Sequence, residues 1–270
     1  MSVTLLVNGI EGAALDPLDR GLHYGDGVFR TLRVENGKPR WWEEQLAKLA
    51  ADAARLGIVN PEASLWRDDL AHLAGRLSGG VIKLLLTRGS GARGYRPPDA
   101  ATTTRILIHD PTPPVSDAWP AEGLNARICD LRLSAQPHLA GIKHLNRLEN
   151  VLARAEWNTS EIHEGLMLDT AGNVVSGVMS NLFLWRDGDL LTPRLEQCGV
   201  AGVARARLLR RASAAGIAIR ETKIGLDEVL AAEEIMLSNS LIGLRRVARL
   251  GERRWPKPTI SPQLVSLLDA

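Results

Sequence analysis

A run rich in proline divides this chain and limits the folds that are open to it. Residues 110–117 read Asp-Pro-Thr-Pro-Pro-Val-Ser-Asp, with three prolines in four positions. Proline lacks the N–H group that the interior of a helix or a sheet requires, so this run predicts a linker. We therefore expect an N-terminal domain over residues 1–112, a linker over 113–121 and a C-terminal domain over 122–270.

Helical and alternating apolar patterns occur on both sides of this linker, which predicts an α+β fold. We predict strands at residues 4–7, 28–34, 81–87, 104–109, 124–131, 165–168, 217–221 and 235–237, a hairpin at 182–191, and helices at 43–56, 60–77, 145–157, 202–215 and from 226 onward. In the helix at 145–157, the apolar side chains at helical spacing are expected to be buried; they are Leu145, Leu148, Val151, Leu152 and Ala155.

The composition excludes several classes of protein. Among 270 residues, 45% are hydrophobic and 24% charged, and the net charge is only +2. These values are typical of a folded domain, and without a basic stripe we expect no nucleic-acid partner. No apolar run reaches the roughly 20 residues of a membrane helix, and the first residues lack a secretory signal. The cysteines, Cys129 and Cys198, have no metal-ligand spacing. We expect a cytoplasmic protein without a metal site.

Lysine is scarce in this chain, which narrows the search for a nucleophilic amine. The six lysines are Lys38, Lys48, Lys83, Lys143, Lys223 and Lys257. Lys143 stands directly before the helix predicted at 145–157, where a packed element would hold it and partial loss of solvent would favour the neutral amine. Taken alone, this placement also fits an ordinary solvated lysine.

Two further segments have the character of anion sites. The sequence from Cys198 to Ala206 places two glycines at the start of a predicted helix, whose free N–H groups and dipole favour a phosphate. Ser238-Asn239-Ser240 follows a strand and offers hydroxyl groups and backbone donors. Taken alone, residues 198–206 also fit an ordinary loop-to-helix turn, and residues 238–240 also fit an ordinary polar strand end.

Residues 143–154, Lys-His-Leu-Asn-Arg-Leu-Glu-Asn-Val-Leu-Ala-Arg, resemble the lysine motif of the 4-amino-4-deoxychorismate lyases. These enzymes belong to the fold-type IV pyridoxal-phosphate group, or class-IV aminotransferase family, together with the branched-chain and D-amino-acid aminotransferases. The resemblance extends over Asp19-Arg20, 24–29, 88–95, 172–184 and 193–205. It implies a D-amino-acid aminotransferase-like α+β fold in two domains, a smaller N-terminal α/β domain and a larger C-terminal pseudo-barrel, in a homodimer.

The same resemblance implies a role for individual residues. Lys143 would form a Schiff base with pyridoxal 5′-phosphate, and Thr31 would lie near the substrate as a second catalytic residue. The other residues implied at the cofactor are Lys48, Ser176, Met179, Val203, Ala204 and Ser240. The backbone amides of Val203 and Ala204 and the hydroxyl of Ser240 would bind the phosphate.

Two of these positions depart from the family pattern. Lys48 stands where the family has an arginine that binds the phosphate, and Ser176 stands where many members have a glutamate at the pyridine nitrogen. A carboxylate there keeps the pyridine protonated, and a serine does not. Our interpretation is that Ser176 favours elimination over transamination, unless it is only a turn residue that does not reach the ring.

The expected reaction converts 4-amino-4-deoxychorismate to 4-aminobenzoate and pyruvate, a step toward folate, with the freed amine of Lys143 as general base. This substrate has two carboxylates, so cationic side chains should line its pocket. The candidates are Arg93 and Arg96, and then Arg30 and Arg147. The alternatives are a D-amino-acid or branched-chain aminotransferase on the same fold, a non-catalytic homologue that binds pyridoxal phosphate, and an α+β binding module without a cofactor.

Overall fold

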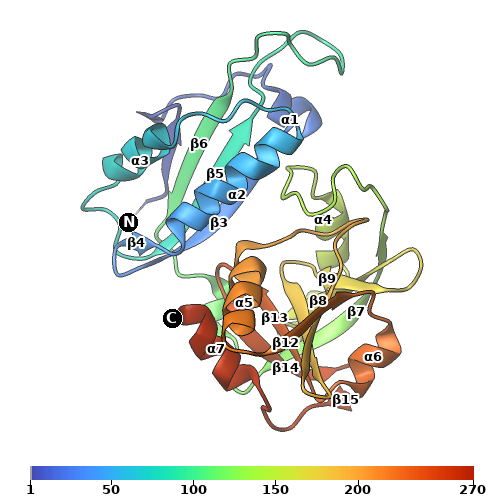
Figure 1. Ribbon diagram of the computed structural model, residues 1–270. Helices are drawn as coiled ribbons and strands as arrows, with labels where there is room; N and C mark the ends of the chain where they lie inside the picture. The colour runs from blue at the N-terminus through green and yellow to red at the C-terminus, as the bar shows by residue number, and fades with distance from the viewer. Residues whose placement is uncertain (1) are drawn as a thin grey trace. The chain divides into compact units, whose positions relative to one another are not determined.

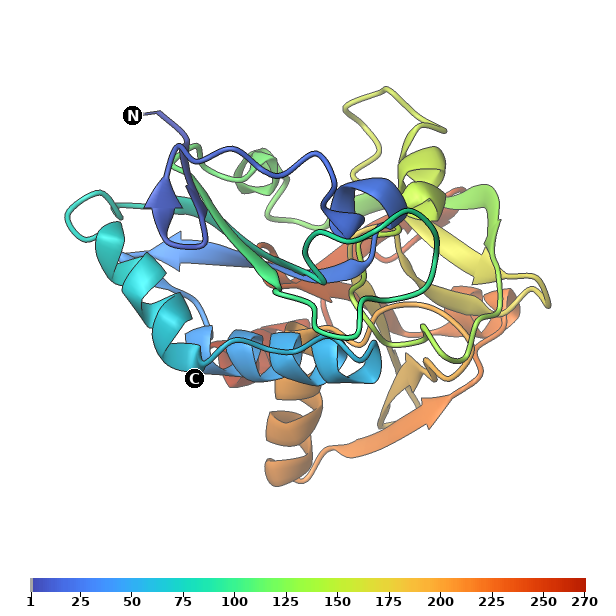
Figure 2. The same cartoon turned by 90° about the horizontal axis from the view of Figure 1, so that it is seen from above.

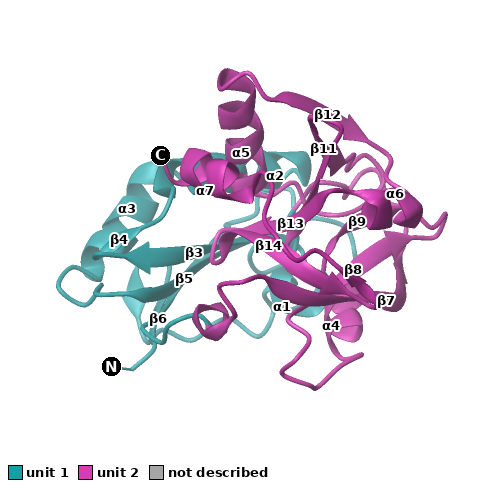
Figure 3. Cartoon of the chain, turned by 90° about the horizontal axis from the view of Figure 1, so that it is seen from below, with its two compact units in different colours: residues 1–114, 143–146 teal, residues 115–142, 147–270 magenta. Residues whose placement is uncertain are grey.

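The computed structural model describes residues 2–270 and divides into two compact units (Figure 3). Unit 1 runs to Pro114 and also contains Lys143–Asn146, and unit 2 comprises Val115–Ile142 and Arg147–Ala270. The chain passes from unit 1 to unit 2 between Pro114 and Val115, within the proline run. The short return of the chain to unit 1 at Lys143 had no signal in the sequence. No helix within residues 2–270 has both the length and the apolar character needed to cross a bilayer.

Unit 1 is an antiparallel sheet with helices (Figure 1). Its elements are β1 (Thr4–Val7), β2 (Ile10–Glu11), α1 (Arg20–Tyr24), β3 (Gly27–Glu35), β4 (Lys38–Pro39), α2 (Trp42–Arg55), α3 (Ala63–His72), β5 (Gly80–Thr87) and β6 (Thr104–Asp110). The strands are ordered β2-β1-β6-β5-β3-β4. Helix α3 begins after Glu62 and is shorter than the helix predicted at 60–77.

The two faces of the unit 1 sheet differ in burial, which follows the period of two along each strand. On β3, the side chains of Val28, Arg30, Leu32 and Val34 are buried, while those between them are partly exposed. The buried face is the one on which α2 and α3 lie (Figure 2), since Arg30 contacts α2. Phe29, the neighbour of Arg30, therefore belongs to the opposite face.

Unit 2 contains a larger mixed sheet. Its elements are η1 (Val115–Ala118), β7 (Leu124–Leu133), α4 (Leu148–Arg154), β8 (Glu164–Asp169), β9 (Val174–Gly177), β10 (Asn181–Arg186), β11 (Asp189–Pro193), α5 (Val203–Ala214), β12 (Ala218–Thr222), α6 (Leu226–Ala231), β13 (Glu234–Asn239), β14 (Gly243–Leu250), β15 (Arg253–Arg254) and α7 (Ser261–Asp269). The strands are ordered β12-β11-β10-β13-β14-β7-β8-β9, and β15 pairs with β14. Helices α5 and α7 lie side by side (Figures 1 and 3).

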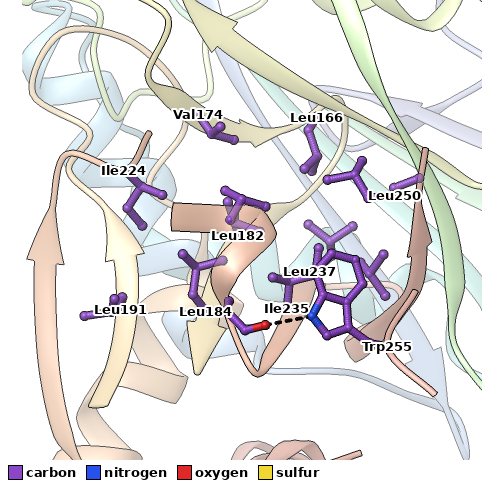
Figure 4. Close-up of a cluster of buried hydrophobic side chains, with 14 of the residues drawn as sticks. Leu166, Val174, Leu182, Leu184, Leu191, Ile224, Ile235, Leu237, Leu250 and Trp255 are labelled. Carbon is purple, nitrogen blue, oxygen red and sulfur yellow. Dashed lines mark hydrogen bonds between the residues drawn. The ribbon is translucent and has the colours of Figure 1, made fainter. Parts of the chain in front are cut away.

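The core of unit 2 lies among β8, β10, β11, β13 and β14 (Figure 4). Leu182, Leu184, Ile235 and Leu237 are fully buried in it. Trp255 closes one end, and its indole N–H donates to the carbonyl of Ala232 at 2.8 Å. Full burial of each such aliphatic side chain contributes about 2 kcal/mol. The strands that carry the candidate site residues are thus held rigidly.

The helix predicted at 145–157 is wrong in extent and in burial. Helix α4 begins only at Leu148 and ends at Arg154. Leu148, Val151 and Leu152 are 74%, 58% and 60% exposed, and Ala155 is also exposed. Residues 143–146 pair with β3 instead of joining the helix. A packed helix therefore does not hold Lys143, and another element must do so.

Candidate active site

Lys143 lies in a short extended segment along the edge of β3. The N–H of Phe29 donates to the carbonyl of Lys143 at 3.0 Å, and the N–H of Leu145 donates to the carbonyl of Gly27 at 2.9 Å. A Cβ atom at Gly27 would lie 2.7 Å from the Leu145 side chain, and one at Gly25 only 2.5 Å from the Asn146 amide. The glycines of the Tyr24-Gly-Asp-Gly27 motif thus make room for the lysine segment.

The side chain of Lys143 lies against the ring of Phe29. Its Nζ atom is 4.4 Å from the ring centroid, and Nζ of Lys83 is 5.0 Å from the same centroid. Lys83 pairs in register with Thr31, the predicted catalytic threonine. The structure therefore brings Lys143, Lys83 and Thr31 to one face of the sheet. Lys83 was not selected from the sequence, because a lysine within a strand is usually solvated.

A buried carboxylate on α2 links several of the predicted residues. Asp52 is fully buried and accepts hydrogen bonds from the Arg30 guanidinium and the Lys48 ammonium. It also accepts the backbone N–H of Lys143 at 3.1 Å. A buried carboxylate requires such partners, since an unpaired charge in the interior is very unfavourable. Asp52 was not selected from the sequence because two of its partners, Arg30 and Lys143, are distant along the chain.

These contacts change the interpretation of Arg30 and Lys48. Arg30 is 2% exposed and bound to Asp52, so its predicted role as a substrate ligand is wrong. Lys48, the predicted phosphate ligand, forms an ion pair with the same carboxylate. Burial, together with the charges of Arg30 and Arg55, lowers the pKa of Lys48 to about 8. In this structure both cations neutralise Asp52.

Arg20 binds the backbone of the loop that carries Arg93 and Arg96. The Arg20 guanidinium donates to the carbonyls of Gly94 and Tyr95 at 3.0 and 3.1 Å. It is only 3% exposed. Arg93 is exposed, and the Arg96 side chain is 83% exposed and pairs with Asp99. The loop backbone is therefore fixed while both side chains are exposed, and their role in carboxylate binding stays a prediction.

In unit 2, the start of α5 has the predicted features of a phosphate site. The helix begins at Val203, one residue after the predicted start at 202, and its first N–H groups have no carbonyl partner within the helix. Asn181 shapes the turn before it: its Oδ1 accepts the N–H of Gly202 at 3.2 Å, and its Nδ2 donates to the carbonyl of Val200 at 2.7 Å. The sequence reasoning missed Asn181, although an amide at the head of an apolar strand was a signal.

The end of β13 lies beside this helix start, because Asn181 pairs in register with Ser238. Ser238 is fully buried, and its Oγ has no hydrogen-bond partner among the described residues. Asn239 donates to the carbonyl of Met179 at 3.1 Å, which joins the Ser240 turn to the Met179 turn. A buried hydroxyl next to a helix N-terminus fits a phosphate monoester, and so these residues suit the phosphate of pyridoxal phosphate.

Ser176 and Met179 lie on a strand and turn organised by Glu164. Ser176, on β9, is 7% exposed and pairs with Met167 of β8. Glu164 is 2% exposed; its carboxylate accepts the N–H groups of Val178 and Met179 at 3.1 and 3.2 Å. Burial raises the pKa of Glu164, while the Ser180 hydroxyl and these N–H groups oppose the rise. Glu164 thus fixes the segment that begins at Ser176.

Arg147, the last substrate candidate, precedes α4 and belongs to unit 2. One of its guanidinium nitrogens lies 3.5 Å from the amide oxygen of Asn150. Burial lowers the pKa of Arg147 to about 10, so the side chain remains charged at neutral pH. Its predicted role in carboxylate binding therefore stays a prediction.

Comparisons with known proteins identify the family of this chain and its fold. The family model described as amino-transferase class IV matches residues 27–250. The aminodeoxychorismate lyase of Vibrio harveyi is 33% identical over 90% of this chain and 89% of its own length. The crystal structure of 4-amino-4-deoxychorismate lyase from Pseudomonas aeruginosa has a TM-score of 0.91 and 46% identity, covering 98% of this chain and 97% of that one.

The fold is shared more widely than the sequence. The branched-chain amino acid aminotransferase of Escherichia coli is 21% identical and has a TM-score of 0.84, over 97% of this chain and 91% of that one. This similarity confirms the predicted two-domain α+β fold of type IV. Together with the lysine motif and the family match over most of its length, it leads to one conclusion: the chain belongs to the class IV aminotransferase family.

Proposed function

We propose that this protein is a pyridoxal-phosphate-dependent lyase that converts 4-amino-4-deoxychorismate to 4-aminobenzoate and pyruvate. The observation that carries the proposal is the 46% identity to a lyase of that name over nearly the whole of both chains. The lysine on the β3 edge and the anion site at α5 support it. The test is an assay of the purified holoenzyme for both products. Glutamate formed from an amino acid and 2-oxoglutarate would instead indicate an aminotransferase.

Each site residue has a definite task in this proposal. Lys143 would hold the cofactor through its side-chain amine, and the same amine would act as general base toward a proton of the substrate ring. The amides of Val203 and Ala204 and the hydroxyl of Ser240 bind the phosphate. Thr31 orients the departing enolpyruvyl group or the water that protonates it. The bound cofactor supplies a conjugated ring that accepts the electrons released with the proton.

Arg93 is the first candidate ligand for a substrate carboxylate, because it is exposed on a loop whose backbone is fixed. Replacing Arg93 by alanine should raise KM about tenfold, equivalent to about 1.4 kcal/mol, with a smaller change in kcat. The measurement is steady-state formation of 4-aminobenzoate. Arg67→Ala, at an exposed arginine of α3, provides the control for simple loss of charge. An unchanged KM would remove Arg93 from the pocket and leave Arg96 as the next candidate.

Ser176 is proposed to favour elimination over transamination. A carboxylate at this position would keep the pyridine nitrogen protonated and favour transamination, as the ring would hold more of the released charge. We expect Ser176→Glu to raise the ratio of transamination to elimination about tenfold, or about 1.4 kcal/mol between the two barriers. Both products are measured in one incubation. Ser176→Ala, which adds no charge, should leave the ratio near its original value, and an equal ratio in all three proteins would contradict the role.

We also propose a homodimer in the cytoplasm. Support for the dimer comes from the exposed apolar face of α4, formed by Leu148, Val151 and Leu152, because a patch of this kind usually meets a partner. Cys129 and Cys198 are buried free thiols, which suits a reducing compartment, and burial raises their pKa to about 12 and 11. Light scattering on the purified chain measures its oligomeric state.

A further inference from the structure

Asp52 has no chemical step in the proposed reaction, yet its carboxylate binds the backbone of Lys143. The N–H of Lys143 donates to Oδ2 of Asp52 at 3.1 Å, although the two residues are 91 positions apart. Asp52 lies on the buried face of α2 and is fully buried. An aspartate in a helix core is costly, so its contacts must account for its presence.

The surroundings of Asp52 keep its carboxylate charged. Arg30 reaches it from β3 and Lys48 from one turn earlier on α2, and both are cationic donors. A carboxylate so paired is an ionised acceptor, and a hydrogen bond to an ionised acceptor is about twice as strong as a neutral one. The amide of Lys143 is therefore bound by a strong acceptor that the interior of unit 1 holds in place.

The second polar backbone group of Lys143 is also fixed. Its carbonyl accepts the N–H of Phe29 at 3.0 Å, so β3 holds one side of the peptide and α2 the other. The side chain leaves this anchored backbone with Nζ 4.4 Å from the centre of the Phe29 ring. A flexible lysine stem can direct its amine to one place only if its Cα is held, because each rotatable bond adds to the spread of positions.

We propose that Asp52 is a positioning residue for Lys143, holding through the backbone amide the point from which the reactive side chain leaves the chain. The expected effect of Asp52 on catalysis rests on the proposed function, in which Lys143 is the reactive lysine. It also gives Arg30 and Lys48 a task, which is to keep the positioning carboxylate ionised. A buried ion pair with a purely structural task would not require contact with the lysine that carries the chemistry.

Hydrogen exchange at single amides in the cofactor-free protein tests the contact directly. We expect Asp52→Asn to speed exchange of the Lys143 amide about tenfold, because the charged acceptor is lost. Exchange of the Leu145 amide, which bonds to β3, should change much less. Since a buried Arg30 without its partner endangers folding, the double variant R30M/D52L provides an uncharged replacement of similar volume. It should show the same selective effect at Lys143.

Unit 1 contains a matched control. Asp69 of α3 is also buried and pairs with Arg105 of β6, but it makes no contact with residues 143–146 in the described structure. Asp69→Asn should destabilise unit 1 by a similar mechanism and change exchange at Lys143 by no more than about twofold. Equal acceleration of the Lys143 and Leu145 amides in the Asp52 and Asp69 variants would overturn the proposal, because only a general loss of stability would then remain.

The catalytic consequence is measured separately in the holoenzyme. For Asp52→Asn we expect attachment of pyridoxal phosphate, followed by absorbance, to be about tenfold slower, and kcat to fall about tenfold with little change in KM. Asp69→Asn should leave both rates near their original values, and equal rates in the two variants would contradict the positioning role. If the original protein never takes up the cofactor, the proposed function fails, while exchange at Lys143 still decides whether Asp52 holds it.

Discussion

Replacing Lys143 by alanine is expected to lower formation of 4-aminobenzoate by roughly a thousandfold or more. The variant loses both the attachment point of the cofactor and the general base. The visible absorbance of the attached cofactor should disappear from the purified protein. After borohydride reduction, mass spectrometry should locate the adduct on Lys143 in the original protein and find none in Lys143→Ala.

Lys83 provides a demanding control for this experiment. Its ammonium lies 5.0 Å from the centroid of the Phe29 ring, against 4.4 Å for Lys143, so the two amines share one environment. The backbones of both lysines are held, that of Lys83 between β3 and β6 and that of Lys143 by Phe29 and Asp52. Only Lys143 lies in the segment that resembles the family's Schiff-base lysine motif, so we expect Lys83→Ala to retain the adduct. An adduct on Lys83, or an unchanged turnover in Lys143→Ala, would exclude Lys143 as the attachment point.

Local chemistry explains why the sequence alone led to much of this site. The glycines before Val203 predicted the start of α5, because the signal for a helix start is contained in a few adjacent residues. The proline run predicted a break in the chain for a similar reason, and the division into units falls at Pro114. Such features depend on neighbours along the chain and so can be read from it.

Contacts between distant residues explain what could not be predicted. The apolar spacing of Leu148, Val151 and Leu152 is that of an amphipathic helix, but spacing does not tell whether this face meets the same chain, a partner or solvent. Residues 143–146 became a strand edge because β3, more than 110 residues earlier, offered its free side. Asp52 resembled any polar residue of a helix until the fold placed Arg30 beside it.

Glu164 is a further example of a residue defined by nonlocal contacts, and its loss should have a large effect on the stability of unit 2. Its carboxylate accepts N–H groups from Gly165, Val178 and Met179 and the hydroxyl of Ser180. Replacing Glu164 by alanine leaves these buried donors without an acceptor. Because each buried donor left unpaired costs 1–3 kcal/mol, we expect unit 2 to lose about 4 kcal/mol. Chemical denaturation followed by tryptophan fluorescence measures the loss.

Glu234 allows the effect on stability to be separated from an effect on the site. It is fully buried in the same unit and accepts the N–H groups of Thr259, Ile260 and Ser261 at the start of α7. Glu234→Ala should therefore be destabilised to a similar extent. The affinity for pyridoxal phosphate should fall further in Glu164→Ala, because only Glu164 shapes the turn of Met179. Equal affinities in the two variants would contradict this positioning effect.

The dependence of stability on pH gives an independent measure of the buried carboxyl group. Burial raises the pKa of Glu164 above its value in the unfolded chain, near 4.5, so the folded state binds this proton more readily. The contribution of Glu164 to the free energy of unfolding is therefore most favourable below about pH 4.5. It declines as the pH rises through the pKa of Glu164 in the folded state. Glu164→Gln keeps one acceptor oxygen but cannot ionise. We expect it to be less destabilised than Glu164→Ala and to lack this decline, and a Gln variant with the original pH profile would show that Glu164 does not titrate in this range.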